Sequence, residues 1–118
     1  MPPKSWINTP LAGATDLRAG EEVVVRGVAF AGVNAVKQVD VSIDGGQSWR
    51  RAALVGPDLG RFAWRQFELP VRLPAGKYVL ASRVTDVRGN VQTENRVENK
   101  GGYLNSSWRD HAVSISVA

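Results

Sequence analysis

Few side chains in this sequence are of the types that carry out catalysis. The single histidine, His111, has Asp110 beside it, and these two types can form an acid–base pair. They stand just before the last apolar segment, and neighbouring residues of an extended chain point to opposite faces, so we do not expect a dyad. We predict that His111 is a structural or surface residue.

Acidic residues are scattered over expected turns and outward strand positions, with no pair whose spacing requires proximity. They are Asp40, Asp44, Asp58, Glu68, Asp86, Glu94 and Glu98. Gly45-Gly46 lacks the strand–helix context of a phosphate loop, and no dinucleotide fingerprint or zinc spacing is present. The chain contains no cysteine, which excludes disulfides, thiolate ligands and thiol catalysis within it. We therefore predict no catalytic, cofactor-binding or metal-binding residue in this chain.

Residues 36–55 are the stretch around which the remaining elements are organised. Val39, Val41 and Ile43 alternate with polar residues, as in a strand with one buried face. The following Asp44-Gly45-Gly46-Gln47 tolerates the positive φ of a tight turn. This pattern predicts a β-hairpin.

Further strands are expected at 21–30, 62–69, 77–86 and 113–117, after an irregular entering segment over 1–20. In the first of them the small residues face inward and Arg26 faces outward, and Gly27 marks a bulge or close approach. Pro70 is expected to end the second strand. The polar stretch 91–110 has no sustained period and is long enough that we expect it to be functional or packed against another part of the structure.

Short intervals between turn signals, without any helical period, predict an all-β fold. The expected architecture is an immunoglobulin-like antiparallel β-sandwich without its disulfide. Trp49 and Trp64 are expected to fill its core. The chain of 118 residues is long enough for one core, so residues 1–118 are predicted to form a single domain.

Composition limits the partners. The net charge of +4 comes mostly from scattered arginines, which is typical of a solvated surface and speaks against a nucleic-acid partner. No apolar run approaches the ~20 residues that span a bilayer, so no membrane partner is expected. The first five residues form no signal-peptide pattern, and we expect either a cytosolic protein or a piece of a longer one. The compartment, cytoplasmic or periplasmic, stays open.

Several motifs occur in a recognisable order. They are GVAFAG at 27–32, VDVSIDGGQSW at 39–49, Leu69-Pro70, ASRVTD at 81–86 with GNVQ at 89–92, and Asn105 to Trp108. From about Pro10 to its end the chain closely resembles the C-terminal dimerisation domain of the sulfite oxidase family of molybdenum-cofactor oxidoreductases. This resemblance implies a non-catalytic, immunoglobulin-like domain that follows a molybdopterin-binding domain and makes contacts in a homodimer. Molybdenum, held by a pterin dithiolene and a cysteine, is then expected in that preceding domain.

The resemblance also singles out a loop that faces the substrate or the subunit interface. Its candidate residues here are Asn99, Lys100, Gly101, Tyr103, Asn105, Trp108 and Arg109. In sulfite-oxidising members an arginine of this loop binds the oxyanion, and its position falls on Gly101 in this sequence. Lys100 beside it does not reproduce the guanidinium fork, which speaks against sulfite as the parent substrate.

Two alternatives use the same fold without the family's task. A stand-alone β-sandwich module would bind carbohydrate or another ligand through aromatic residues such as Trp6 or Tyr103. An adhesion or structural repeat would give the loop no task at all. A reading frame that continues upstream into a cysteine-bearing domain would favour the family assignment.

Overall fold

The computed structural model describes residues 4–10, 13, 17–31, 35–56, 64–92, 97–99, 102–104 and 112–118. The first sheet contains β1 (Lys4–Thr9), β2 (Glu22–Phe30), β6 (Arg65–Arg72) and β5 (Ala53–Val55), in this spatial order. The second sheet contains β10 (Val113–Val117), β7 (Gly76–Asp86), β3 (Val36–Ser42) and β4 (Arg50–Arg51). A separate hairpin is formed by β8 (Val97–Asn99) and β9 (Gly102–Leu104).

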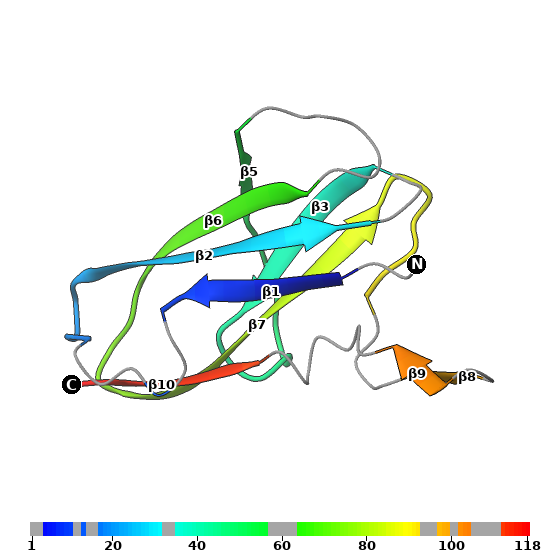
Figure 1. Ribbon diagram of the computed structural model, residues 1–118. Helices are drawn as coiled ribbons and strands as arrows, with labels where there is room; N and C mark the ends of the chain where they lie inside the picture. Colours follow the sequence, from blue (N-terminus) through cyan, green and yellow to red (C-terminus); the bar gives the residue numbers. More distant parts are fainter. Residues whose placement is uncertain are drawn as a thin grey trace.

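The two four-stranded sheets are antiparallel throughout and pack face to face (Figure 1). Both supply the apolar core, which includes Val25 and Phe67 of the first sheet and Val39, Leu80 and Val84 of the second. Each of these side chains is at most 1% exposed. The immunoglobulin-like sandwich predicted from the sequence is confirmed. Among the described residues, no helix is long and apolar enough to cross a membrane.

Strand β2 follows the predicted alternation. Val23, Val25 and Ala29 are buried between the sheets, while Arg26 on the opposite face is exposed. Strand β7 lies between β10 and β3, which explains why both of its faces carry apolar residues. Strand β10 buries alternate residues, as the sequence predicted.

Gly27 in β2 is closely approached by the backbone of β1 and by the Phe67 ring. A Cβ added at this position would lie 2.1 Å from the Trp6 carbonyl oxygen and 2.5 Å from Phe67 Cζ. The pairing register of β1 also shifts between Ile7 and Thr9, opposite this residue. The predicted close approach is confirmed, and only glycine fits it without displacing backbone.

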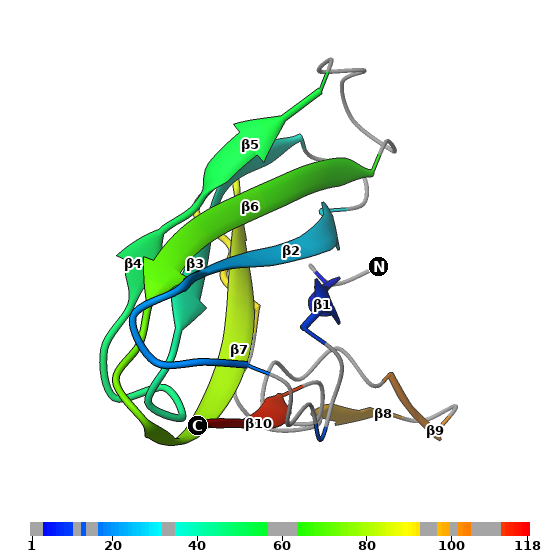
Figure 2. The ribbon, with the colours of Figure 1, turned by 90° about the vertical axis from the view of Figure 1, so that its left-hand side faces the viewer.

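The central hairpin is confirmed for its first half and differs in its second. Strand β4 pairs with β3, but Ala52 is buried and its N–H donates to the Val39 carbonyl at 2.9 Å. Beyond it the chain leaves the second sheet and pairs with β6 of the first as β5 (Figure 2). Segment 36–55 therefore joins the two layers of the sandwich.

The sequence prediction missed one strand and misplaced the end of another. The entering segment contains β1, which pairs with β2 over Lys4–Thr9 despite the prolines on either side. Strand β6 does not end at Pro70 but continues to Arg72, with Pro70 paired to Val24. Proline is tolerated there because β5 pairs only with residues 66–68, so Pro70 lies where β6 is a sheet edge.

Candidate interaction surfaces

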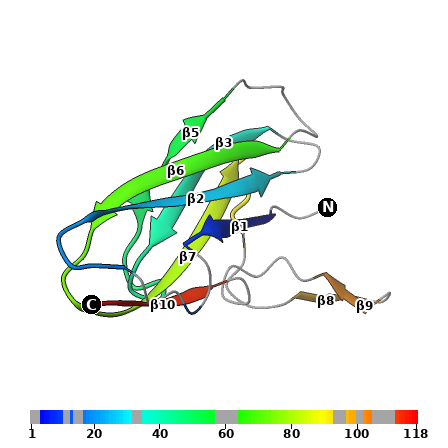
Figure 3. The ribbon, with the colours of Figure 1, turned by 60° about the vertical axis from the view of Figure 1, so that its left-hand side comes forward.

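The loop that the sequence singled out is described only in part. Asn99 ends β8, and Tyr103 in β9 pairs with Glu98 across the hairpin. This hairpin projects beyond β10, outside the two main sheets (Figure 3). Lys100, Gly101, Asn105, Trp108, Arg109, Asp110 and His111 lie outside the described residues. The role predicted for the loop stays a prediction.

The turn at the end of β7 is built around a buried carboxylate. Asp86 is 1% exposed, and its Oδ1 accepts the backbone N–H of Arg88 at 2.9 Å and of Asn90 at 2.8 Å. Its Oδ2 accepts the Asn90 side-chain amide at 2.9 Å. Because these bonds satisfy the buried oxygens, the sequence prediction that this acid forms a turn fits its contacts.

Gln92 anchors the chain as it leaves this turn. Its side chain is 2% exposed and its Oε1 accepts the Ser5 hydroxyl at 2.6 Å. The Ser5 hydroxyl also lies 2.9 Å from that of Ser82 on β7. A buried polar group is costly unless it is hydrogen-bonded, so this network fixes β1 against the second sheet in one arrangement.

The outer face of the first sheet carries an aromatic cluster, which consists of Trp6, Phe30 and Trp64. The Trp64 ring meets Trp6 edge-on with centroids 5.1 Å apart and stacks on Phe30 at 5.0 Å. Trp64 remains 45% exposed. The prediction that Trp64 fills the core is wrong, because Trp64 shares the outward parity of Gln66 in β6, whereas Phe67 points inward.

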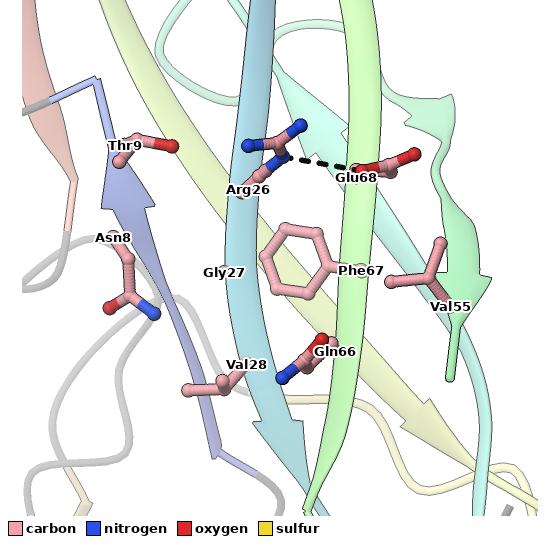
Figure 4. A pocket seen from close by; sticks show the side chains of 9 residues that line it. All are labelled: Asn8, Thr9, Arg26, Gly27, Val28, Val55, Gln66, Phe67 and Glu68. Carbon is pink, nitrogen blue, oxygen red and sulfur yellow. Dashed lines mark hydrogen bonds and ion pairs between the residues drawn. The ribbon is translucent and has the colours of Figure 1, made fainter. Parts of the chain in front are cut away.

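Next to the aromatic cluster lies a depression of about 350 Å³ over β1, β2, β5 and β6 (Figure 4). Arg26 Nε donates to Glu68 Oε2 at 3.3 Å on its surface, and both side chains are well exposed. An ion pair on an open surface contributes little stabilisation. The depression therefore resembles a recess in a contact surface more than a catalytic cleft.

The outer face of the second sheet is dominated by cations. Arg83 lies with its guanidinium carbon 4.1 Å from the centroid of the half-buried Trp49 ring. Asp40 lies 3.9 Å from Arg83 Nη2 and 3.7 Å from Arg51 Nε. Trp49 is thus a platform for an arginine on the outer face, and the prediction that it fills the core is wrong.

The hairpin turn is held by Asp44. Its carboxylate accepts the Ser48 hydroxyl at 2.5 Å, the Ser42 hydroxyl at 2.7 Å and the Ser48 backbone N–H at 2.9 Å. These hydrogen bonds, that of the Ser48 hydroxyl first, hold the pKa of Asp44 well below its ordinary value. The Asp44 carboxylate therefore stabilises the turn and is not available as a catalytic base.

The described residues offer little for metal chemistry. They contain no group of three or more His, Cys, Asp or Glu side chains placed to hold a metal ion. With no cysteine in the sequence, the chain also supplies no thiolate for a molybdenum centre. What the geometry provides is two outer sheet faces, one aromatic with charges of both signs and one cationic.

Comparison with known proteins finds one family model that matches almost the whole chain. The model of the Mo-co oxidoreductase dimerisation domain matches residues 1–117. Mitochondrial sulfite oxidase of Macaca fascicularis is 36% identical over 126 residues, covering 100% of this chain and 22% of the relative. The human enzyme is 35% identical with the same coverage. The chain thus spans about a fifth of the length of these relatives.

A solved structure shows the same architecture. The sulfane dehydrogenase SoxCD from Paracoccus pantotrophus is similar with a TM-score of 0.75 and 25% sequence identity. The similarity covers 100% of this chain and 33% of that one. The whole sandwich is therefore shared, within a longer polypeptide.

Proposed function

This chain belongs to the Mo-co oxidoreductase dimerisation domain family, and we propose from this that it holds together two copies of a longer molybdenum-cofactor enzyme without performing chemistry itself. The observation that carries the proposal is the match of the family model to residues 1–117. The absence of a cysteine and the apolar and charged outer sheet faces support it.

The catalytic part of the parent is proposed to precede this domain and to bind the molybdenum cofactor. The sulfite oxidases that match this chain over its entire length are about five times as long as the chain. Their additional length leaves room for such a domain. The cofactor supplies oxygen-atom transfer and electron transfer when bound there. The described residues contain no group of three metal-ligating side chains, and the sequence has no cysteine to supply a thiolate ligand.

The loop Asn99 to Arg109 is proposed to face the parent's substrate or the subunit interface. The β8–β9 hairpin projects from the sandwich, where a neighbouring domain or subunit can reach it. Because Gly101 occupies the position of the oxyanion-binding arginine in the resemblance, we propose a parent substrate other than sulfite.

The alternative of a carbohydrate-binding module is less well supported by the aromatic residues. Trp6 is half-buried, its ring receives the edge of Trp64, and Lys4 Nζ lies 5.4 Å from its centroid. The Trp6 ring is therefore already partly covered by its own neighbours.

Co-purification tests the proposed function. Two copies of the chain with different affinity tags are co-expressed, and one is captured. We expect the second to be retained, while the metal analysis of the pure protein gives far less than one molybdenum per chain. Recovery of the captured copy alone, or stoichiometric molybdenum, would contradict the proposal.

A further inference from the structure

We propose that two copies of this chain pair through the outer face of the first sheet, with the aromatic cluster of Trp6, Phe30 and Trp64 at the centre of the contact. This inference rests on the proposed function, because it names the surface that would perform it. It assigns the outer face of the first sheet to a second copy of this chain. The outer face of the second sheet is then available for other partners.

The aromatic cluster has the composition expected at the centre of an interface. Trp64 is 45% exposed although two other rings contact it, so much of its apolar surface is still open to solvent. Val28 pairs with Trp6 in the register and extends the apolar area along β2. Tryptophan is enriched among residues that dominate binding energy, and an exposed apolar cluster on a sheet face marks a contact site.

The charges around the cluster favour a second copy as the partner. A two-fold contact places the same patch on both sides, so the patch must complement itself. Arg26 and Glu68 provide opposite charges on adjacent strands, close enough to form an ion pair at 3.3 Å. Across a two-fold axis, Arg26 of one copy can therefore face Glu68 of the other.

The outer face of the second sheet does not meet this requirement. It carries Arg51 and Arg83 around the carboxylate of Asp40, with Lys77 exposed further along β7. Two such faces brought together would place like charges opposite one another. This face suits an acidic partner better than a copy of itself.

The size of the first face predicts a weak dimer. Its longest strand, β2, has nine residues and the sheet has four strands. Spacings of about 3.3 Å along a strand and 4.8 Å between strands give a flat area on the order of 500 Å² per copy. The pair would bury roughly 1,000 Å², near the lower limit for specific interfaces. The expected affinity is therefore low for this chain alone.

Substitution of one exposed apolar residue on each face tests the inference. Trp64→Glu places a charge in the aromatic cluster, and Val79→Glu is the matched control, since Val79 is 40% exposed on the outer face of the second sheet. Far-UV circular dichroism checks that both variants fold. In sedimentation velocity we expect the Kd of the dimer to rise at least tenfold for Trp64→Glu and to stay within twofold of wild type for Val79→Glu.

The outcomes separate this inference from the proposed function. A wild-type dimer that Val79→Glu disrupts and Trp64→Glu leaves intact would overturn the chosen face while the dimer stands. A wild type that stays monomeric would overturn both. A monomer in which the aromatic cluster binds the separately produced parent domain would assign that surface to docking within the subunit.

Single spin labels give an independent readout, because the chain has no cysteine of its own. Gln66→Cys places a label on the outer face of β6, and Ser114→Cys places one on the exposed side of β10. We expect dipolar coupling between copies to be strong for label 66 and weak for label 114. The reverse order would overturn the inference even if Trp64→Glu proved unstable.

Discussion

Ser5 and Gln92 are 87 positions apart in the sequence, and the hydroxyl of the first donates to Oε1 of the second at 2.6 Å. The side-chain amide of Gln92 also donates to the Ser5 carbonyl oxygen at 3.3 Å. Both side chains are buried, so bulk water does not compete for these bonds. This contact joins the start of β1 to the segment that follows β7 and ties the sheets together through hydrogen bonds.

Gln92→Leu is expected to lower the free energy of unfolding by about 1–3 kcal/mol, because the buried Ser5 hydroxyl and its neighbours lose their acceptor. Urea unfolding measures the change. Gln47→Leu, at an exposed turn position, is the control and should stay within about 0.5 kcal/mol of wild type. Equal effects of the two substitutions would contradict a special role for Gln92.

Gly27→Ala is expected to destabilise the fold by about 1–3 kcal/mol or more, because the new methyl group meets the Trp6 carbonyl oxygen and the Phe67 ring. Gly56→Ala is the control. It has a positive φ of 80° but nothing within 4 Å of an added Cβ, so it bears conformational strain alone. Thermal unfolding should rank Gly27→Ala as the less stable variant, and the opposite ranking would refute the close approach.

The pH dependence of stability should depend on Asp44. Because its pKa is lowered in the folded chain, the carboxylate contributes stability above the ordinary Asp pKa of 3.8, and this contribution is lost as pH falls below that value. Asp44→Asn should therefore be less stable than wild type at neutral pH, with the difference shrinking in acid. Urea midpoints between pH 2 and about 7 check this, and a difference that grows in acid would be the wrong sign.

The Trp49–Arg83 contact should be worth much less than a buried tryptophan. A double-mutant cycle of Trp49→Ala and Arg83→Met is expected to give a coupling energy of about 0.5–1 kcal/mol, typical of a cation–π pair near the protein surface. Chemical denaturation of the four proteins provides the cycle. A coupling indistinguishable from zero would mean that the ring and the guanidinium do not stabilise each other.

Alternating burial made much of the sandwich predictable. Val23, Val25 and Ala29 in β2, and Val113 and Ile115 in β10, repeat with the period of two that places residues between sheets. Asp44 and the glycines after it identified the hairpin turn, because their chemistry is local.

Other features depend on tertiary contacts, which leave no local pattern in the sequence. β1 is short and flanked by prolines, and the pairing with β2 that makes it a strand is tertiary. The size of Trp64 favours the core, whereas its parity with Gln66 directs it outward. The network of Ser5, Ser82 and Gln92 leaves no local pattern, since its members come from three distant segments.

Sedimentation equilibrium of the wild-type chain, over micromolar to hundreds of micromolar and at low and high salt, tests most directly that this is a dimerisation domain. We expect a monomer–dimer equilibrium whose dimer survives at high salt, because screening over about 8–10 Å weakens ion pairs but not the burial of aromatic rings. A single species of monomer mass across the whole range, at both ionic strengths, would contradict the assignment of dimerisation to this chain.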